Sequence, residues 1–183
     1  MKIAWIGIGV MGESMAGHLL DAGYELFVYN RTVSKTDGLV KRGATLLKEV
    51  KDAPLNADVI FSMVGYPKDV EEVYLGENGL IKTAKEGQVF VDMTTSSPTL
   101  AKKISEEFAK VGAAALDLPV TGGDIGAKNG TLSIMAGGDK KVFEETVLPL
   151  VKNFGKNITY FGEAGKGQYT KLANQIAIAT TMI

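Results

Sequence analysis

The sequence predicts an α/β fold, a doubly wound and mostly parallel sheet covered by helices on both faces. Three observations predict it. Short apolar runs alternate with helical patterns along most of the 183 residues. The chain holds 22 glycines, and several of them stand where one such segment ends. The apolar fraction of 45% and the charged fraction of 22% are typical of a globular chain with a real core.

The predicted elements follow one another in strand–helix order. The first strand ends at Gly7, and the next segment places apolar residues at helical spacing until Gly23 stops it. Ser96-Ser97-Pro98 is a typical helix start, with a cap candidate and a proline suited to the first turn. The predicted strands are 2–7, 25–29, 58–64, 88–93, 113–118, 131–136 and 157–161. The predicted helices are 11–22, 34–42, 69–75, 98–110 and 139–151, followed by a long apolar helix from about residue 165 that meets no stop signal.

Composition and charge exclude several classes of protein. Twenty basic and 21 acidic residues give a net charge of -1, without the basic excess of an electrostatic nucleic-acid binder. The absence of cysteine and the single histidine exclude disulfides and a thiolate or histidine-rich metal site. No stretch approaches the roughly 20 continuous apolar residues of a membrane helix. We therefore expect a cytoplasmic protein with no metal and with no membrane or nucleic-acid partner.

A glycine-rich loop joins the first predicted strand to the first predicted helix. Its sequence is Gly7-Ile8-Gly9-Val10-Met11-Gly12, a G-x-G-x-x-G in the strand–turn–helix context that such a motif requires. In that motif the first glycine permits a tight turn, the second lets the backbone approach a pyrophosphate, and the third allows close packing of helix on strand. The loop therefore predicts a dinucleotide site, and a plain connecting turn is the alternative.

The end of the second strand bears on which dinucleotide binds. An NAD site usually places a carboxylate there for the ribose 2′-OH, whereas this chain has Asn30-Arg31-Thr32. Arg31 can pair with a 2′-phosphate, and Asn30 and Thr32 can donate hydrogen bonds. The segment favours NADP and leaves NAD open, and the alternative for Arg31 is a solvated loop cation.

Three separated segments together resemble one family, the β-hydroxyacid dehydrogenases. They are 7–32, 117–138 and 165–174, and they run in order along essentially the whole chain. This group includes 3-hydroxyisobutyrate dehydrogenase, tartronate semialdehyde reductase and the glyoxylate/succinic semialdehyde reductases, with 6-phosphogluconate dehydrogenase as a more distant relative. The resemblance implies hydride transfer between NADP(H) and a small β-hydroxy acid or its semialdehyde. It also implies a homo-oligomer.

The resemblance also implies roles for individual residues. Thr121, Gly122 and Gly123 fill the position that binds the substrate carboxylate, and a plain turn is the alternative for them. Lys171 fills the position of the catalytic lysine, and Asn174 that of the asparagine that orients substrate. About 60° separates the last two on a helix, so both can face one cleft.

Further cofactor contacts are implied at Met63 and Val64, which end the third long strand, and at Thr95, which follows the fourth. The chain departs from the family pattern in the loop that begins at Val64 and at Gln175, which replaces a second asparagine.

We expect a dinucleotide-binding domain over residues 1–163. Residues 164–183 are then the start of an interdomain helix that leads to an absent all-helical domain, and the isolated chain is expected to be a poor enzyme.

Two alternatives to an enzyme stay open. One is a noncatalytic dinucleotide-binding or scaffold module on the same fold, and the other is an NAD-dependent sensor. Lys171 with Asn174 favours the enzyme, because a pure binding module has no chemical need of that lysine. The one histidine, His18, is expected to be structural and without a partner.

Overall fold

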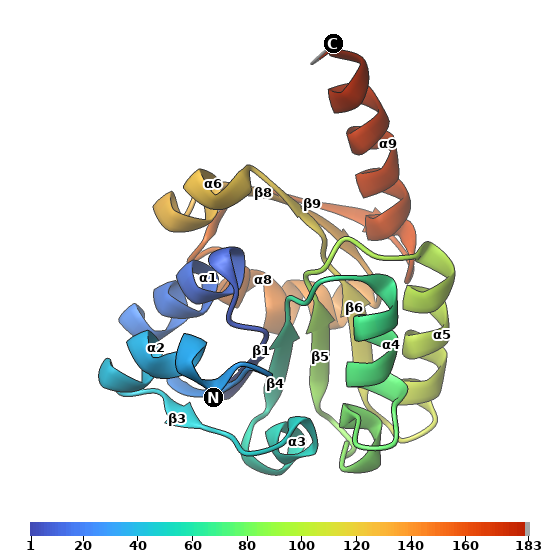
Figure 1. Ribbon diagram of the computed structural model, residues 1–183. Helices are drawn as coiled ribbons and strands as arrows, with labels where there is room; N and C mark the ends of the chain where they lie inside the picture. Colours follow the sequence, from blue (N-terminus) through green and yellow to red (C-terminus); the bar gives the residue numbers. More distant parts are fainter. Residues whose placement is uncertain (182–183) are drawn as a thin grey trace.

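The computed structural model describes residues 1–181, and these form one sheet covered by helices on both faces (Figure 1). The strands are β1 (Lys2–Ile6), β2 (Glu25–Tyr29), β3 (Thr45–Leu46), β4 (Val59–Ser62), β5 (Val89–Asp92), β6 (Ala114–Asp117), β7 (Val120–Thr121), β8 (Leu132–Gly137) and β9 (Gly155–Gly162). The α-helices are α1 (Val10–Asp21), α2 (Asp37–Lys41), α3 (Ala53–Asn56), α4 (Pro67–Leu75), α5 (Pro98–Ala109), α6 (Gly123–Asn129), α7 (Lys140–Val142), α8 (Leu148–Val151) and α9 (Lys166–Thr181). The predicted last helix is α9, and the final two residues of its predicted range, 182 and 183, lie outside the described residues.

The strand order confirms the predicted doubly wound class. Strands run β3-β2-β1-β4-β5-β6-β8-β7, with β9 paired to β8, and every pair from β3 to β6 is parallel. The order reverses between β1 and β4, and in open α/β sheets ligands bind outside the carboxyl ends of the strands at such a reversal. The sheet ends in a mixed part, because β8 runs antiparallel to β6 and β7 and parallel to β9.

Two apolar layers hold the sheet between its helices. Along β1, Ile3 and Trp5 enter one layer while Ala4 and Ile6 enter the other, as the two-residue period of a strand requires. Helices α1 and α8 cover the first layer, and α4 and α5 cover the second (Figure 1). Trp5 stacks on Phe61 with 5.3 Å between ring centroids. Since β1 is buried on both faces, the loop that follows it starts from a fixed point.

Some short elements differ from the sequence prediction. The strands β3 and β7 and the helices α3 and α6 were not predicted. The segment predicted as one helix over 139–151 is divided into α7, a π-helical turn at Phe143–Val147, and α8. Within residues 1–181 no helix is long and apolar enough to cross a membrane. The same residues contain no cluster of three or more His, Cys, Asp or Glu suited to a metal ion.

Candidate functional site

The three glycines of the loop after β1 are required for different reasons. Gly7 has φ 97°, and a Cβ there would overlap the carbonyl oxygen of Met63. A Cβ at Gly12 would overlap the carbonyl oxygen of Gly7 and lie 3.0 Å from Trp5 Nε1. Gly9, by contrast, has no atom of the protein within 4 Å of an added Cβ. Gly7 thus lets the loop pass close to the backbone after β4 and Gly12 lets α1 pack close to β1 and the loop, whereas the open side of Gly9 is free for a ligand.

The start of α1 is suited to an anion. Gly9 is its N-cap and offers no side-chain hydrogen bond to the first turn. The first N–H groups of a helix lack intrahelical partners and carry a partial positive charge, which attracts phosphate. Because Gly9 has no side chain to cap the helix, the N–H groups of the first turn stay available to a pyrophosphate. Because Gly9 has no Cβ, there is also space for the pyrophosphate beside the backbone.

Asn30 holds this loop from the end of β2. Its Oδ1 accepts a hydrogen bond from the N–H of Ile8 at 2.9 Å, and its Nδ2 donates to the carbonyl of Thr32 at 2.8 Å. The side chain of Ile8 is buried in the core. The two hydrogen bonds of Asn30 therefore fix the glycine loop relative to the end of β2. This role differs from the predicted donation of a hydrogen bond to a 2′-phosphate.

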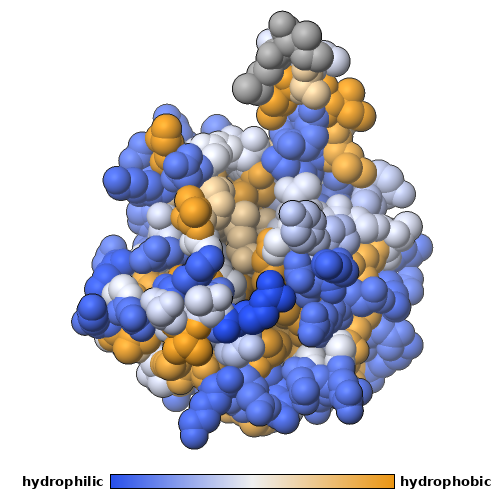
Figure 2. Space-filling view, viewed as in Figure 1, coloured by the Kyte–Doolittle hydropathy of each residue, from blue (hydrophilic) through white to orange (hydrophobic). Residues whose placement is uncertain are grey.

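A cleft of about 990 Å³ opens along the carboxyl ends of β1, β2 and β4. Ten of the twelve residues predicted to contact the cofactor line it, and Ile8 and Thr95 do not. Those ten are Gly7, Gly9, Val10, Met11, Gly12, Asn30, Arg31, Thr32, Met63 and Val64. Figure 2 shows the same face of the molecule hollowed, with pale and orange atoms between blue, hydrophilic rims. The cleft lies at the reversal of strand order, where a doubly wound sheet binds its ligand.

Charged side chains surround the part of the cleft next to β2. The side chain of Arg31 is 85% exposed, and its Nη1 lies 3.7 Å from Oδ1 of Asp69. The other oxygen of Asp69 accepts a hydrogen bond from the N–H of Tyr66 at 2.9 Å, which fixes this carboxylate at the start of α4. Lys35 and Lys68 also line the cleft. Arg31 is therefore an exposed cation at the cleft, within reach of one fixed carboxylate.

The predicted substrate segment lies between β7 and α6. Thr121 ends β7 and pairs with Ser133 of β8. Gly122 and Gly123 have φ 129° and 64°, are both exposed, and form the N-cap and first residue of α6. Only glycine adopts such angles without strain, so the two positions expose backbone rather than side chains.

The predicted catalytic lysine is on α9. Lys171 is only 6% exposed, and burial lowers its pKa from the ordinary value of 10.5. Asn174, one turn later, is half-buried and donates from Nδ2 to Oε1 of Gln175 at 3.3 Å. The root of α9 lies near Gly137 at the end of β8, whereas Thr121 pairs near its beginning. The root of α9 and Thr121 thus lie against different residues of one strand, β8, and neither part of the predicted substrate site lines the cleft described above.

Sequence reasoning missed two buried carboxylates at the ends of β5 and β6. Asp92 and Asp117 are direct neighbours across these strands, and both are almost completely buried. Burial raises the pKa of each to about 6, against backbone and side-chain hydrogen bonds that lower it, and the charge of Asp117 raises the pKa of Asp92 further. The signal available in the sequence was an aspartate ending an otherwise apolar strand segment.

Asp92 organises the loops behind the cleft. Its Oδ1 accepts hydrogen bonds from Ser62 Oγ and from the N–H of Thr94, both at 3.0 Å. Ser62 Oγ also shares a hydrogen bond of 2.9 Å with the hydroxyl of Tyr74. Thr94 Oγ1 then accepts from the N–H of Val64, a cleft residue, at 3.0 Å. A buried polar network thereby links the carboxyl ends of β4 and β5.

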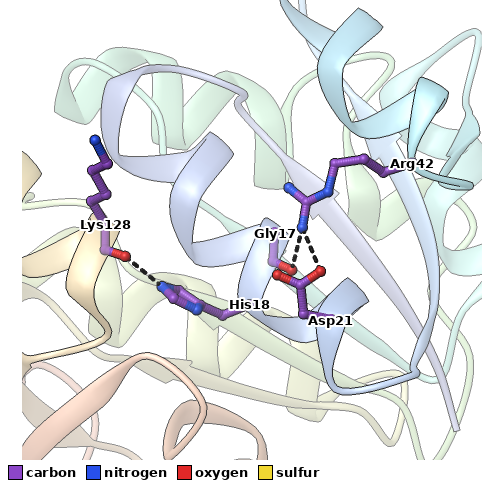
Figure 3. A network of polar contacts seen from close by, with 5 residues as sticks. All are labelled: Gly17, His18, Asp21, Arg42 and Lys128. Carbon is purple, nitrogen blue, oxygen red and sulfur yellow. Dashed lines mark hydrogen bonds and ion pairs between the residues drawn. The ribbon is translucent and has the colours of Figure 1, made fainter.

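The expectation that His18 lacks a partner was wrong. Its Nε2 lies 3.0 Å from the carbonyl oxygen of Ala127 in α6. It lies 3.2 Å from the carbonyl oxygen of Lys128 in the same helix (Figure 3). On the other side of α1, Arg42 donates to Oδ1 of Asp21 at 2.7 Å. Since the partners of His18 are more than a hundred residues away in the chain, no local pattern could reveal them. His18 connects α1, the helix of the glycine loop, to α6, the helix that follows the predicted substrate segment.

The fold and the cleft define a dinucleotide-binding α/β protein. Residues 2–162 match the family described as the NAD binding domain of 6-phosphogluconate dehydrogenase, and the chain belongs to this family. The chain is 55% identical over 181 residues to an uncharacterised oxidoreductase, YkwC, of Bacillus subtilis, covering 99% of this chain and 62% of that protein. It is 44% identical to 2-hydroxy-3-oxopropionate reductase of Escherichia coli, covering 98% of this chain and 61% of that enzyme.

Comparison with solved structures finds proteins of the same kind. A 3-hydroxyisobutyrate dehydrogenase of Mycobacterium tuberculosis, in a structure with L-serine, superposes with a TM-score of 0.91 at 29% identity, covering 97% of this chain and 60% of that one. Psf3 in complex with NADP+ and 2-OPP gives a TM-score of 0.91 at 31% identity, covering 96% and 62%. These findings confirm the family resemblance and the fold. The chain spans 54 to 62% of the length of the first curated relatives it matches.

Proposed function

We propose that the chain is the dinucleotide-binding part of an oxidoreductase that prefers NADP(H) and interconverts a small β-hydroxy acid and its semialdehyde. The observation that carries the proposal is the cleft at the β1–β4 reversal, with the open backbone of Gly9 at the uncapped start of α1. The names of its relatives, which are dehydrogenases and reductases of small hydroxy acids, support the reaction class.

The preference for NADP rests on the end of β2. No carboxylate stands among Asn30, Arg31 and Thr32 to accept bonds from a ribose 2′-OH, and the exposed guanidinium of Arg31 lines the cleft. Guanidinium groups bind phosphate through paired, charge-assisted hydrogen bonds. A 2′-phosphate would compete with the fixed carboxylate of Asp69 for Arg31, and Lys35 provides a second cation on the same side.

The bound dinucleotide supplies the hydride, and the chain's own residues bind, orient and manage one proton. In our proposal Lys171 donates the proton from Nζ to the developing alkoxide during reduction and removes it during oxidation. Burial moves the pKa of Lys171 toward neutrality, which suits a group that must both give and take a proton. Thr121 with the backbone of Gly122 and Gly123 binds the substrate carboxylate, and Asn174 orients the substrate.

The binding half of the proposal is tested with Gly9→Ala. Because the added methyl meets no atom of the protein, the variant should keep its melting temperature but lose at least tenfold in NADPH affinity by calorimetry. Gly38→Ala is the matched control, since its methyl meets only the flexible end of the Glu13 side chain, outside the cleft. Arg31→Ala should bring NADPH affinity down to that for NADH. Unchanged NADPH binding in Gly9→Ala would disprove the placement of the pyrophosphate, and tighter binding of NADH by the wild type would disprove the preference.

The catalytic half requires turnover by the complete protein with NADPH and a panel of small semialdehydes. Lys171→Ala should lose most of kcat and keep its dinucleotide affinity, whereas Lys141→Ala, an exposed lysine away from the site, should behave as the wild type. Tight dinucleotide binding without turnover of any substrate would favour the noncatalytic module instead. Assembly as a homo-oligomer and a cytoplasmic location remain predictions, and the plant relatives of this chain are named as mitochondrial.

A further inference from the structure

The first turn of α9 is fixed to the sheet by a single side chain. Oδ1 of Asp117 accepts a hydrogen bond from the N–H of Gly165 at 2.7 Å, and Oδ2 accepts one from the N–H of Gln168 at 2.8 Å. Asp117 lies at the end of β6, 2% exposed. A carboxylate that accepts from N–H groups at a helix start both satisfies unpaired donors and complements the helix dipole. Asp117 thus determines where α9 begins.

A second set of bonds fixes the direction of the helix. The fully buried side chain of Gln168 donates from Nε2 to the carbonyl of Thr94 at 2.7 Å and accepts at Oε1 from the N–H of Ser96 at 2.8 Å. A Cβ at Gly167 would overlap the carbonyl oxygens of Asp117 and Met135, so the helix backbone lies directly on β6 and β8. The root of α9 is therefore held by two strands and by the loop after β5.

Lys171 depends on this root for its position. It lies three residues after Gln168, on the same face of the helix, and it is the last buried residue in the described part of α9. From Leu172 onward the helix leaves the domain, and the exposed side chains of Leu172 and Ile176 show how little of the protein surrounds it. Figure 1 shows α9 standing out from the rest of the fold. Because Lys171 lies one turn after Gln168 on the same helix, a shift at the root would move Lys171 as well.

We infer that Asp117 is a positioning residue for the proposed reaction: through the start of α9, and together with Gln168, it holds Lys171 in place. The inference rests on the proposed function for its chemistry, but the geometric part can be tested without turnover. Asp117→Asn keeps the size of the side chain and replaces one acceptor oxygen by an NH₂ group. That NH₂ group is a donor and faces a backbone N–H, which is also a donor, so one of the two hydrogen bonds is lost.

The main readout is the pKa of Lys171, followed by NMR after ¹³C-methylation of the lysines, with Lys171→Arg to assign its signal. If α9 loosens at its root, Lys171 gains solvent and its pKa should rise toward 10.5 in Asp117→Asn. Removal of a negative charge alone would lower the pKa of a nearby lysine, so the direction distinguishes displacement from direct electrostatics. Asp139→Ala, which removes the capping carboxylate of α7, is the control and should leave Lys171 unchanged.

Turnover provides the second readout. In the complete protein Asp117→Asn should lower kcat at least tenfold while the dissociation constant for NADPH stays within twofold. Gln168→Met, similar in volume but without the two side-chain bonds, should act in the same direction and serves if Asp117→Asn does not fold. An unchanged pKa of Lys171 in both variants would overturn the inference. If the pKa of Lys171 rises in Asp117→Asn but the wild-type protein turns over no semialdehyde, the positioning role of Asp117 would be upheld and the proposed function rejected.

Discussion

Asp92 makes the stability of the protein depend on pH in a direction opposite to ordinary acid denaturation. Burial raises its pKa from 3.8 to about 6, so the folded state holds this proton more tightly than the unfolded chain does. The resulting stabilisation is complete below about pH 4 and is lost as the pH rises through about 6. Asp92→Asn removes this titration and keeps an oxygen that can accept from Ser62 and Thr94.

The magnitude follows from the two pKa values. Linkage gives Asp92 a stabilisation of about 2 kcal/mol near pH 4.5 and almost none near pH 7. Other carboxylates change the absolute curves of both proteins, and the comparison cancels those that do not interact with Asp92, so the neighbouring Asp117 is the exception. The stability of the wild type relative to Asp92→Asn should therefore fall by about 2 kcal/mol between these two pH values.

Urea unfolding at each pH, followed by fluorescence of the single tryptophan, measures this difference. Trp5 is fully buried against Phe61 and so reports on loss of the core. Glu145→Gln, at an exposed position, controls for the loss of one formal charge. If wild type and Asp92→Asn show parallel stability curves from pH 4.5 to 7, the argument that burial raises the pKa of Asp92 is refuted.

Two further predictions concern packing around α1. Gly12→Ala should destabilise the fold by about 3 kcal/mol, because the methyl meets the backbone of Gly7 and cannot be accommodated by a side-chain movement. Urea unfolding measures this change, and a smaller loss of unfolding free energy in Gly12→Ala than in Gly38→Ala would contradict the prediction. His18→Ala should cost about 1 kcal/mol for its contact with the carbonyls of Ala127 and Lys128, and should speed amide exchange in α6 selectively. Uniform exchange across the protein would show that His18 does not link the two helices.

The sequence predicted the long elements well, for reasons of local physics. Strands such as β1 and β4 are apolar runs bounded by turn residues, so their period and length are visible without a fold. The strands β3 and β7 have two residues each and carry no period at all. Helix α6 was missed because Gly122, Gly123 and Gly126 make its segment resemble a loop.

The site was predictable where a motif fixes the backbone and not where contacts are distant. Arg31 and all residues of the glycine loop except Ile8 line one cleft, because a strand–turn–helix unit contains its own geometry, and their contacts with a cofactor stay predictions. Asp117 binds the start of α9 from 48 residues away, and Gln168 reaches Thr94 across 74. Such pairings exist only once the sheet has brought β5, β6 and α9 together, so residue types alone did not reveal them.

The contrast between the glycine loop and Arg31 has a consequence for how the protein can change. Gly7 and Gly12 are fixed by the backbone atoms they approach, so substitutions there alter the fold before they alter binding. Arg31 projects into solvent, and a substitution there disturbs only one long ion pair at the surface. If the end of β2 selects the dinucleotide as proposed, substitutions there can exchange one dinucleotide for another with little loss of stability.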